Sequence, residues 1–166
     1  MAPRSSAILV ARADAREGLH PPVVSWGLGQ GWIAEFDWVG TRDVTPWLAA
    51  PAGVAFMEWL GVDAMRAWQH ALAWDGAQRL AHRWGVTLPM EEAQVAGMVT
   101  VPLPDRAGRT PQQAFALKRA LLLEDHIEVQ LHAFRERLWV RISGQVYNEP
   151  ADLERLADAI DRRLGA

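Results

Sequence analysis

Residues 127–143 carry an alternation of apolar and polar side chains that constrains the fold more than any other feature of the chain. The stretch 127–132 (IEVQLH) alternates with a period of two, and so does the stretch 138–143 (LWVRIS). Such alternation is typical of strands that bury one face and expose the other. The link 134–137 (FRER) predicts a hairpin turn, so we expect two neighbouring antiparallel strands.

The segments on either side of this hairpin predict a small α+β domain. Residues 95–103 are typical of a further strand, and the capping box at 110–113 (TPQQ) opens a helix to about residue 124. Asn148 is expected to cap a last helix, whose apolar stripe consists of Leu153, Leu156, Ala157, Ile160 and Leu164. Residues 87–166 are therefore predicted to fold as β-α-β-β-α, with an antiparallel sheet covered by helices.

The first half of the chain predicts no self-contained sheet. We expect a strand at 6–11, a loop rich in glycine and tryptophan at 23–38, and two long helices at 45–60 and 63–84. A strand and two long helices do not make a domain by themselves. Residues 1–86 are therefore interpreted as the end of a larger structure.

The helix predicted at 45–60 has an unusual composition. Thr45 is its expected N-cap, with Pro46 at the first helical position. Glu58 is its only charged residue, and it is apolar almost all round. Such a helix has to be buried, either inside a larger protein or against a partner.

Composition excludes several classes of function. A net charge of −3 gives no electrostatic reason to expect nucleic acid or an anionic membrane as a partner. The chain contains no cysteine, and its five histidines lack the paired spacing of metal ligands, so no metal site is predicted. The most apolar segment, at 44–57, is too short to span a bilayer. A cytoplasmic protein is the resulting expectation.

Two short patterns are candidates for binding chemistry. Thr41 follows Gly40 just before the apolar helix, where a hydroxyl and neighbouring backbone N–H groups can hold a phosphate. The alternative is that Thr41 and Asp43 only cap and turn the chain. Arg141 is expected to point away from the apolar face of its strand, where it can bind a carboxylate with two parallel hydrogen bonds. The alternative is an ordinary solvated arginine.

The loop at 23–38 leaves further alternatives open. Its aromatic residues either line a pocket, seal a subunit contact or pack into a core; they are Trp26, Trp32, Phe36 and Trp38. The glycines at 27–31 (GLGQG) do not stand between a clear strand and a helix, which favours a turn over a phosphate-binding loop. The only lysine of the chain, Lys118, lies in the helix predicted from residue 110.

Several of these segments, taken in order, resemble one enzyme family. The stretches 22–27 (PVVSWG) and 36–43 (FDWVGTRD) resemble the isopenicillin N epimerase-like members of the class V aminotransferases. Arg141-Ile142-Ser143 with Tyr147-Asn148 resembles a segment near the end of that family and of the related cysteine desulfurases. The opening residues 2–7 (APRSSA) resemble the family segment just after its His-Lys cofactor site. The resemblance covers nearly the whole chain and implies a C-terminal part of such an enzyme.

The resemblance implies a fold and a set of roles. It implies that residues 1–86 end a large α/β cofactor-binding domain and that residues 87–166 form a small C-terminal α+β domain. The family uses pyridoxal phosphate, held as a Schiff base on a lysine that is expected to precede this chain. The position of Thr41, with Gly40, implies contact with the cofactor phosphate across a dimer interface. The position of Arg141 implies a grip on the α-carboxylate of an amino-acid substrate. No catalytic residue is expected here.

Three functions follow as alternatives. The chain is expected to be a portion of a pyridoxal-phosphate enzyme that is inactive alone, because Lys118 lacks the context of the cofactor lysine. It is alternatively half of a split enzyme, complemented by an N-terminal chain. A third alternative, from another class, is a non-catalytic domain that binds a protein partner through tryptophan-rich surfaces. The resemblance does not select among epimerase, transaminase, desulfurase and lyase chemistry.

Overall fold

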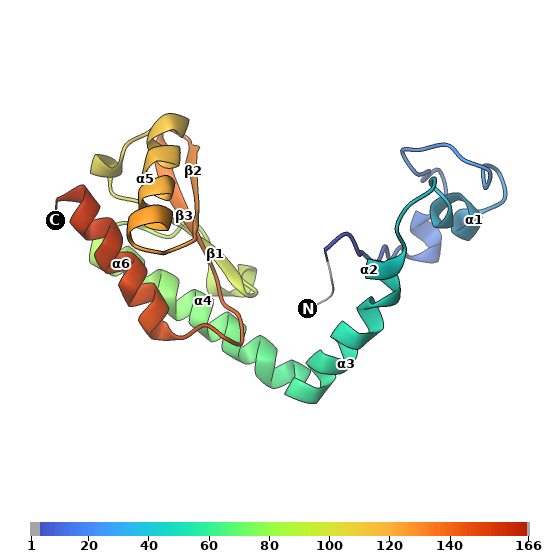
Figure 1. The fold of residues 1–166 in the computed structure, drawn as a ribbon, viewed down its shortest axis with the longest axis horizontal. Helices are drawn as coiled ribbons and strands as arrows, with labels where there is room; N and C mark the ends of the chain where they lie inside the picture. Colours follow the sequence, from blue (N-terminus) through green and yellow to red (C-terminus); the bar gives the residue numbers. More distant parts are fainter. Residues whose placement is uncertain (1–3, 166) are drawn as a thin grey trace. The chain divides into compact units, whose positions relative to one another are not determined.

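The chain forms two compact units, Met1–Trp59 and Leu60–Ala166. The computed structural model describes residues 4–165 (Figure 1), so residues 2 and 3 of the opening segment 2–7 lie outside the described part. The boundary between the units falls at the end of helix α3 (Ala50–Leu60). The proposed division into a cofactor domain at 1–86 and a small domain at 87–166 remains a prediction.

A three-stranded antiparallel sheet forms the centre of the C-terminal unit. The strands are β1 (Met98–Pro102), β2 (Gln130–Phe134) and β3 (Arg137–Ser143), and their order in the sheet is β1-β3-β2. The predicted small α+β fold with an antiparallel sheet is confirmed. The predicted strand at 127–132 begins later than expected, because only residues from Gln130 onward pair with β3.

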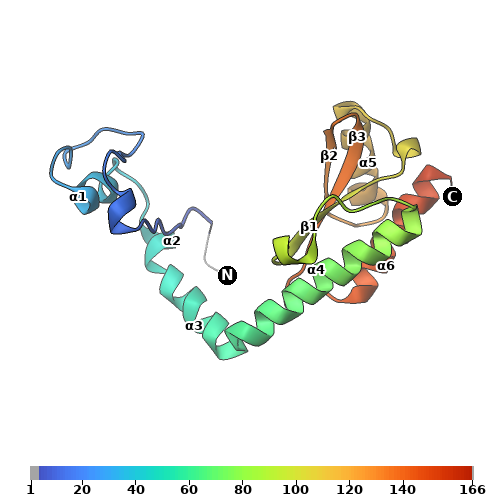
Figure 2. The same cartoon turned by 180° about the vertical axis from the view of Figure 1, so that it is seen from behind.

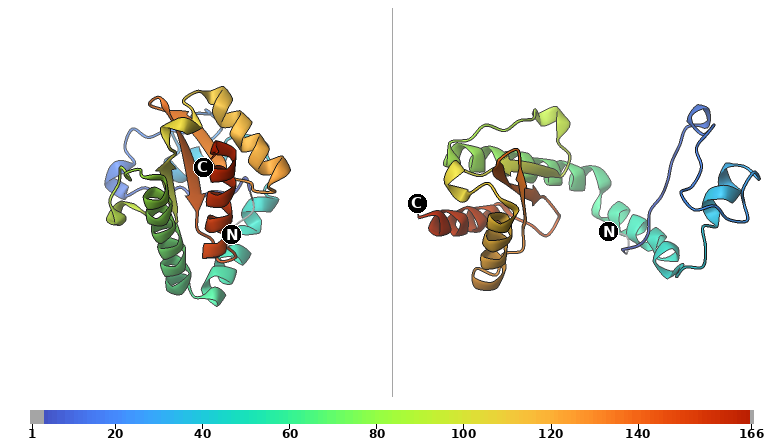
Figure 3. Two further views of the ribbon diagram at one scale, coloured as in Figure 1. Left: turned by 90° about the vertical axis from the view of Figure 1, so that its left-hand side faces the viewer. Right: turned by 90° about the horizontal axis from the view of Figure 1, so that it is seen from above.

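Three helices cover one face of this sheet. They are α4 (Val62–Trp84), α5 (Pro111–Glu124) and α6 (Pro150–Leu164), which Figures 2 and 3 show alongside the strands. The core between helices and sheet includes several side chains with no more than 3% exposure, among them Leu103, Leu121, Leu138, Val140, Ile142 and Ile160. Burial alternates along β3, so its other face carries no helix and stays open.

The ends of α5 and α6 test two predicted caps. Thr110 caps α5, and Gln113 returns the bond in a capping box, as predicted. The predicted cap of α6, Asn148, is wrong by one position, because Glu149 is the N-cap and forms a capping box with Asp152. The Nδ2 group of Asn148 instead donates to Oδ2 of Asp152 at 3.2 Å. Asn148 and Glu149 therefore both donate hydrogen bonds to Asp152 at the start of α6.

Short elements complete the C-terminal unit. The 3-10 helix η2 (Glu92–Gln94) precedes β1, and η3 (Asp105–Ala107) follows it. The hairpin turn consists of Arg135 and Glu136, whose φ angles are 48° and 56°. Positive φ at both central residues matches the right-handed twist of a two-residue hairpin, although glycine and asparagine adopt it more readily.

The N-terminal unit differs from its predicted elements in three places. It contains η1 (Ala13–Ala15), α1 (Trp32–Asp37), α2 (Thr45–Leu48) and most of α3. The predicted strand at 6–11 is absent: these residues form no ladder within 4–165, and Val10 is 85% exposed. The loop predicted at 23–38 ends in α1, because a turn of helix forms after Gly31.

The helix predicted at 45–60 is divided into α2 and α3. Pro51 has no N–H to donate to the preceding turn, which accounts for the break next to Ala49. Thr45 is the first residue of α2 and not its N-cap; its N–H donates to Oδ1 of Asp43 at 2.9 Å. The carboxylate of Asp43 therefore accepts a backbone N–H at the start of α2, a role that was predicted for the hydroxyl of Thr45.

Apolar side chains of α2 and α3 face solvent in this chain. No residue of α3 is buried, and Trp59 is 78% exposed. Trp47, Leu48, Val54 and Phe56 are also largely exposed. The expectation that this segment is covered by other protein atoms therefore stays a prediction. Within residues 4–165, no helix has both the length and the apolar character needed to cross a bilayer.

Close backbone packing at Gly144 gives a first prediction. The N–H of Gly144 donates to the oxygen of Gly97 at 2.8 Å, and a Cβ at Gly144 would stand 2.5 Å from the backbone oxygen of Gln69. Gly144→Ala is expected to lower the free energy of unfolding by about 1–3 kcal/mol, because backbone atoms of α4 would have to move. Gly97→Ala should cost less, since its Cβ would meet the Gln69 side chain at 3.3 Å. Urea unfolding measures both, and equal effects would contradict the prediction.

His70 predicts a pH dependence of stability. Its Nε2 lies 3.2 Å from Oε1 of Glu92, and its Nδ1 lies 3.2 Å from the oxygen of Val95, which ties α4 to η2. The hydrogen bond with Glu92, the largest cause, raises the pKa of His70 above its ordinary 6.5. A raised pKa gives stability that is complete below the unfolded-state pKa and is lost as pH rises through the folded-state pKa.

The measurement compares wild type with His70→Gln across that range. The stability that wild type holds over the variant should be larger at about pH 5.5 than at about pH 8.5. His82→Gln, an exposed histidine on the same helix, is the control and should not show this pattern. An equal difference between wild type and His70→Gln at both pH values would rule out the Glu92 contact as its cause.

Candidate functional site

An open groove of about 500 Å³ lies where β2 begins and β3 ends, beside the first turns of α6. Apolar side chains of Ile142, Leu153 and Leu156 form part of its lining. Its polar lining consists of Glu128, Gln130, Arg141, Ser143, Tyr147, Asn148 and Asp152. We call this the Arg141 groove. Apolar walls with a few convergent polar groups are typical of small-molecule sites.

Arg141 stands on the open face of the sheet. It pairs in register with Thr100 of β1 on one side and with Gln130 of β2 on the other. Its side chain is exposed, as predicted from the alternation, and among residues 4–165 it joins no ion pair. Its guanidinium donors are therefore available to a carboxylate or phosphate that enters the groove.

The segment after β3 brings the other predicted residues to the same groove. Ser143, Tyr147 and Asn148 all line it together with Arg141. The loop is fixed to α4 by a hydrogen bond of 2.6 Å from Nε2 of Gln69 to Oε1 of Gln145. Tyr147 is 81% exposed, so its ring and hydroxyl are free to meet a ligand or another part of a protein.

Two acidic residues also belong to the Arg141 groove, and they differ in how they are engaged. Oδ2 of Asp152 accepts from Nδ2 of Asn148 and from the N–H of Glu149, both at 3.2 Å. These bonds direct its charge to the start of α6. Glu128 is exposed and makes no ion pair within the described residues. Arg141 therefore supplies the one arginine or lysine side chain of the lining, beside the unpaired carboxylate of Glu128.

Gln130 and Lys118 form a pair that the sequence did not single out as functional. Nζ of Lys118, on α5, donates to Oε1 of Gln130 at 3.0 Å, and both residues are half-buried. The position of Gln130 could have been predicted from the hairpin. Counting outward from a turn at Arg135–Glu136 places Gln130 directly opposite Arg141.

Gly40 and Thr41 lie in the other unit, in the connection between α1 and α2. Gly40 has φ of 125°, a backbone conformation that favours glycine, and no atom lies within 4 Å of where its Cβ would stand. Thr41 is exposed. Its neighbour Arg42 donates from Nη2 to the oxygen of Asp37 at 3.2 Å, which keeps a cation at this turn.

Asp43 closes the same connection with a negative charge. Hydrogen bonding from Thr45 holds the pKa of Asp43 below its ordinary value, so it is ionised at neutral pH. Its Oδ1 is occupied by the Thr45 N–H. The hydroxyl of Thr41 is thus exposed at this turn, whereas the carboxylate of Asp43 is hydrogen-bonded at the start of α2.

The aromatic residues before this turn are not a buried core. Trp26 stacks with Trp38 at a centroid distance of 6.5 Å, and Trp32 contacts Phe36 at 4.2 Å. Trp26 is 86% exposed, so core packing does not account for it within this chain. The buried residues of this segment are Gly27 and the charged Glu35, which has 8% exposure.

Glu35 organises the loop around it. Its Oε2 accepts from Nδ1 of His20 at 2.6 Å, and its Oε1 accepts from the N–H of Gly29 at 3.1 Å. The His20 hydrogen bond, the largest cause, holds the pKa of Glu35 below its ordinary value. Gly27 is required beside it, because a Cβ there would stand 2.0 Å from the oxygen of Ala34. The glycines of 27–31 therefore serve a tight turn, as expected.

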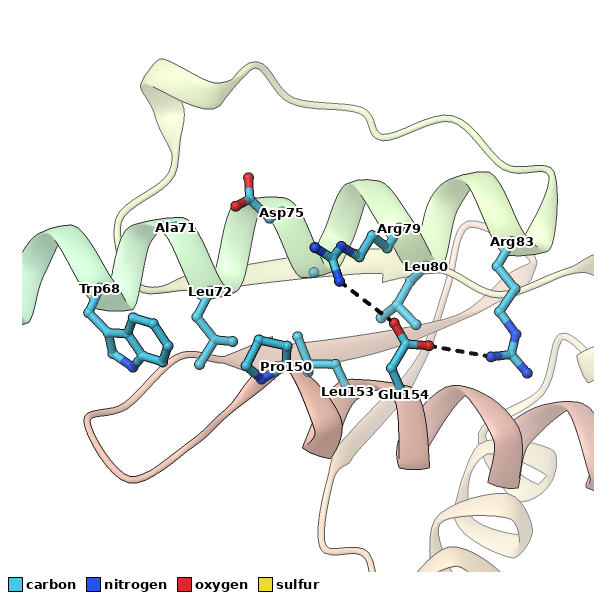
Figure 4. Close-up of a pocket in the computed structure, with 11 residues that line it drawn as sticks. Trp68, Ala71, Leu72, Asp75, Arg79, Leu80, Arg83, Pro150, Leu153 and Glu154 are labelled. Atoms are coloured by element: carbon cyan, nitrogen blue, oxygen red, sulfur yellow. Dashed lines mark ion pairs between the residues drawn. The ribbon is translucent and has the colours of Figure 1, made fainter.

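A smaller pocket lies between α4 and α6 (Figure 4). Its volume is about 100 Å³, and its apolar lining includes Trp68, Leu72 and Leu153. Glu154 bridges Arg79 and Arg83 at 3.9 and 3.7 Å across its wall. Glu154 offsets part of the charge of these two arginines, and Asp75 in the same lining joins no ion pair within the described residues. Within residues 4–165, no cluster of histidine and acidic side chains is suited to hold a metal ion.

Comparison with known proteins gives matches along almost the whole chain, although no family model matches. A protein described as "Probable L-cysteine desulfhydrase, chloroplastic" from Arabidopsis thaliana is 35% identical over 175 residues, which cover 96% of this chain and 37% of that protein. An "L-cysteine desulfhydrase" from the same plant is 30% identical, covering 90% of this chain and 37% of the relative.

A second kind of relative has a different named activity. "Isopenicillin N epimerase" from Streptomyces clavuligerus is 33% identical over 153 residues, which cover 90% of this chain and 37% of that protein. This chain therefore spans less than half the length of the curated relatives that it matches. It belongs to the class V aminotransferase-like family of pyridoxal-phosphate-dependent enzymes, and it corresponds to a C-terminal part of these proteins.

Proposed function

We propose that this chain supplies substrate and cofactor contacts to a pyridoxal-phosphate-dependent enzyme that acts on an amino acid, and that it does not catalyse the reaction alone. The observation that carries this proposal is the Arg141 groove. It gathers Arg141, Ser143, Tyr147 and Asn148, four residues of one motif, around an open space. Bound pyridoxal phosphate supplies an electron sink for bonds at the α-carbon of an amino acid.

Arg141 is the proposed binding group for the substrate α-carboxylate. Its planar guanidinium can donate two parallel hydrogen bonds to a carboxylate, and such charge-assisted bonds are stronger than neutral ones. Binding the carboxylate at one fixed position orients the α-carbon of the substrate.

Gly40 and Thr41 are the proposed contacts of the cofactor phosphate. The exposed hydroxyl of Thr41 is a donor, and Gly40 leaves the backbone open for close approach, so the residues present fit a phosphate group. The nearby Arg42 adds positive charge. We infer that these residues serve the cofactor within the assembled enzyme, in a dimer or against an N-terminal half.

Lys118 is not the proposed attachment point of the cofactor. Its Nζ is engaged with Gln130, on a helix of the C-terminal unit. The covalent lysine of the enzyme is therefore proposed to come from polypeptide other than residues 4–165. The substrate is proposed to be an amino acid, in line with the L-cysteine named in the descriptions of two relatives.

A split enzyme is the second candidate, and one observation favours it. The apolar side chains of α2 and α3 are exposed in this chain, with Trp59 at 78%. Such a surface needs other protein atoms to cover it. A complementary N-terminal chain that covers these helices would complete the enzyme, whereas a protein-binding domain without catalysis would cover them with an unrelated partner.

The carboxylate contact predicts a ligand preference. Titration of the chain with L-alanine, followed by NMR of the arginine side chains and backbone, is expected to move signals of the Arg141 groove. L-Alaninamide, which lacks the carboxylate, should bind at least about tenfold more weakly, because a hydrogen bond to a charged group contributes about 1.5–3 kcal/mol.

Variants locate this preference at one side chain. Arg141→Gln should abolish the difference between L-alanine and L-alaninamide. Arg106→Gln, an exposed arginine outside the groove, is the control and should keep it. Binding of L-alanine that is the same in Arg141→Gln as in wild type would refute the assignment of Arg141.

The cofactor chemistry predicts a negative result with a positive counterpart. The purified chain is mixed with equimolar pyridoxal phosphate, reduced with borohydride and weighed by mass spectrometry. No stoichiometric adduct at Lys118 is expected, since its amine is hydrogen-bonded and half-buried. An adduct that forms on a second chain, only after an N-terminal partner is added, would select the split enzyme. A stoichiometric adduct at Lys118 with turnover of an amino acid would overturn the proposal.

A further inference from the structure

The hydrogen bond between Lys118 and Gln130 has no role in the function proposed above. Lys118 is the only lysine of the chain, and its Nζ donates to Oε1 of Gln130 at 3.0 Å. It lies on the same side of α5 as Ala114 and Leu121, which are buried in the core. Because β2 is an edge strand, a long side chain from α5 can reach Gln130 at the border of the Arg141 groove.

The chemistry of lysine fixes the orientation of the Gln130 amide. An ammonium group has three donors and no acceptor, so only the oxygen of the amide can face it. The Nε2 group of Gln130, which carries two donors, is then the free end of the side chain. Lys118 thus determines which end of Gln130 is engaged and which end remains for other partners.

This orientation matters because Gln130 and Arg141 are directly opposite each other on β2 and β3. Side chains opposite each other in an antiparallel pair share a face, with Cβ atoms roughly 4.5–5.5 Å apart. An unrestrained amide oxygen at Gln130 would be an acceptor within reach of the guanidinium. Yet no hydrogen bond joins Gln130 to Arg141 in the described part of the chain.

We propose that Lys118 is a positioning residue for the carboxylate site: it holds the oxygen of Gln130, keeps it from occupying Arg141, and leaves hydrogen-bond donors facing the ligand. This rests on the function proposed for Arg141. A carboxylate entering the groove meets the guanidinium unoccupied by a neighbouring acceptor, and the Gln130 amide presents a donor. Lys118 does not touch the ligand and acts through Gln130.

The first test measures L-alanine binding by the folded chain and its variants. Lys118→Met keeps an unbranched side chain one atom shorter and removes the donor, and it is expected to weaken L-alanine binding roughly threefold to tenfold, the range of one hydrogen bond. Lys118→Arg restores a cationic donor and should recover most of the affinity. Arg119→Gln, which removes a positive charge from the next position of α5, should leave binding unchanged.

A double-mutant cycle separates positioning from simple charge. If Lys118 acts through Gln130, the Lys118→Met change should have no further effect on affinity in a Gln130→Met background. If Lys118 contributes only its charge, the change will weaken binding equally in both backgrounds, which overturns the proposal. Unfolding midpoints are recorded for each variant, since a merely structural role would lower stability while the folded fraction kept wild-type affinity. A Lys118→Met variant with lowered stability and wild-type affinity therefore also overturns the proposal.

The controls distinguish this inference from the function on which it rests. L-Alanine binding that Arg141→Gln abolishes and Lys118→Met leaves intact refutes only the role of Lys118. Absence of L-alanine binding by wild type, or binding unaffected by Arg141→Gln, refutes the carboxylate site and the inference together. The positioning role of Lys118 is supported if Lys118→Met weakens L-alanine binding and Lys118→Arg restores it. It also requires that Lys118→Met has no effect on binding in the Gln130→Met background.

Discussion

The pairing of β2 with β3 is the constraint on which the Arg141 groove depends. The turn at Arg135–Glu136 fixes the first pair, and every later pair is counted outward from it. Because side chains alternate along a strand, a slip of one residue would turn Arg141 into the core and bring Ile142 to solvent. The complete burial of Leu138 and Val140 opposes that slip, so the apolar face of the hairpin holds the polar face in place.

The helices make the groove rigid from the other side. Arg83 on α4 donates to Asp158 and Asp161 of α6, at 2.7 and 2.6 Å, and the indole of Trp84 donates to Asp161. At the far end of α6, Arg162 and Arg163 bind Asp125 after α5, and the hydrogen bond from Arg163 is the main reason that the pKa of Asp125 is lowered. Since α6 supplies one wall of the groove, contacts far from Arg141 hold the position of that wall.

Sequence patterns predicted the C-terminal unit well because its elements are determined locally. The capping box at Thr110 and the alternation at 138–143 encode their structures within a few residues. The N-cap of α6 was displaced to Glu149 because several acceptors compete for one helix start. The exposure of Arg141 followed from alternation, whereas its pairing with Gln130 required the register and the contact of Gln130 with Lys118 required the packing of α5.

Parts of the N-terminal unit differ from their predicted structure for a different physical reason. An apolar run such as residues 6–11 indicates that the segment is buried in the assembled protein. A segment forms a β-strand only when it pairs with a neighbouring strand. Here Ile8 is 77% exposed and α3 has no buried residue, so the pattern demands contacts that residues 4–165 do not provide. The relatives are more than twice as long as the matched region. The same mismatch between apolar pattern and exposure therefore supports the proposal that Gly40 and Thr41 reach their functional setting only when other polypeptide covers these helices.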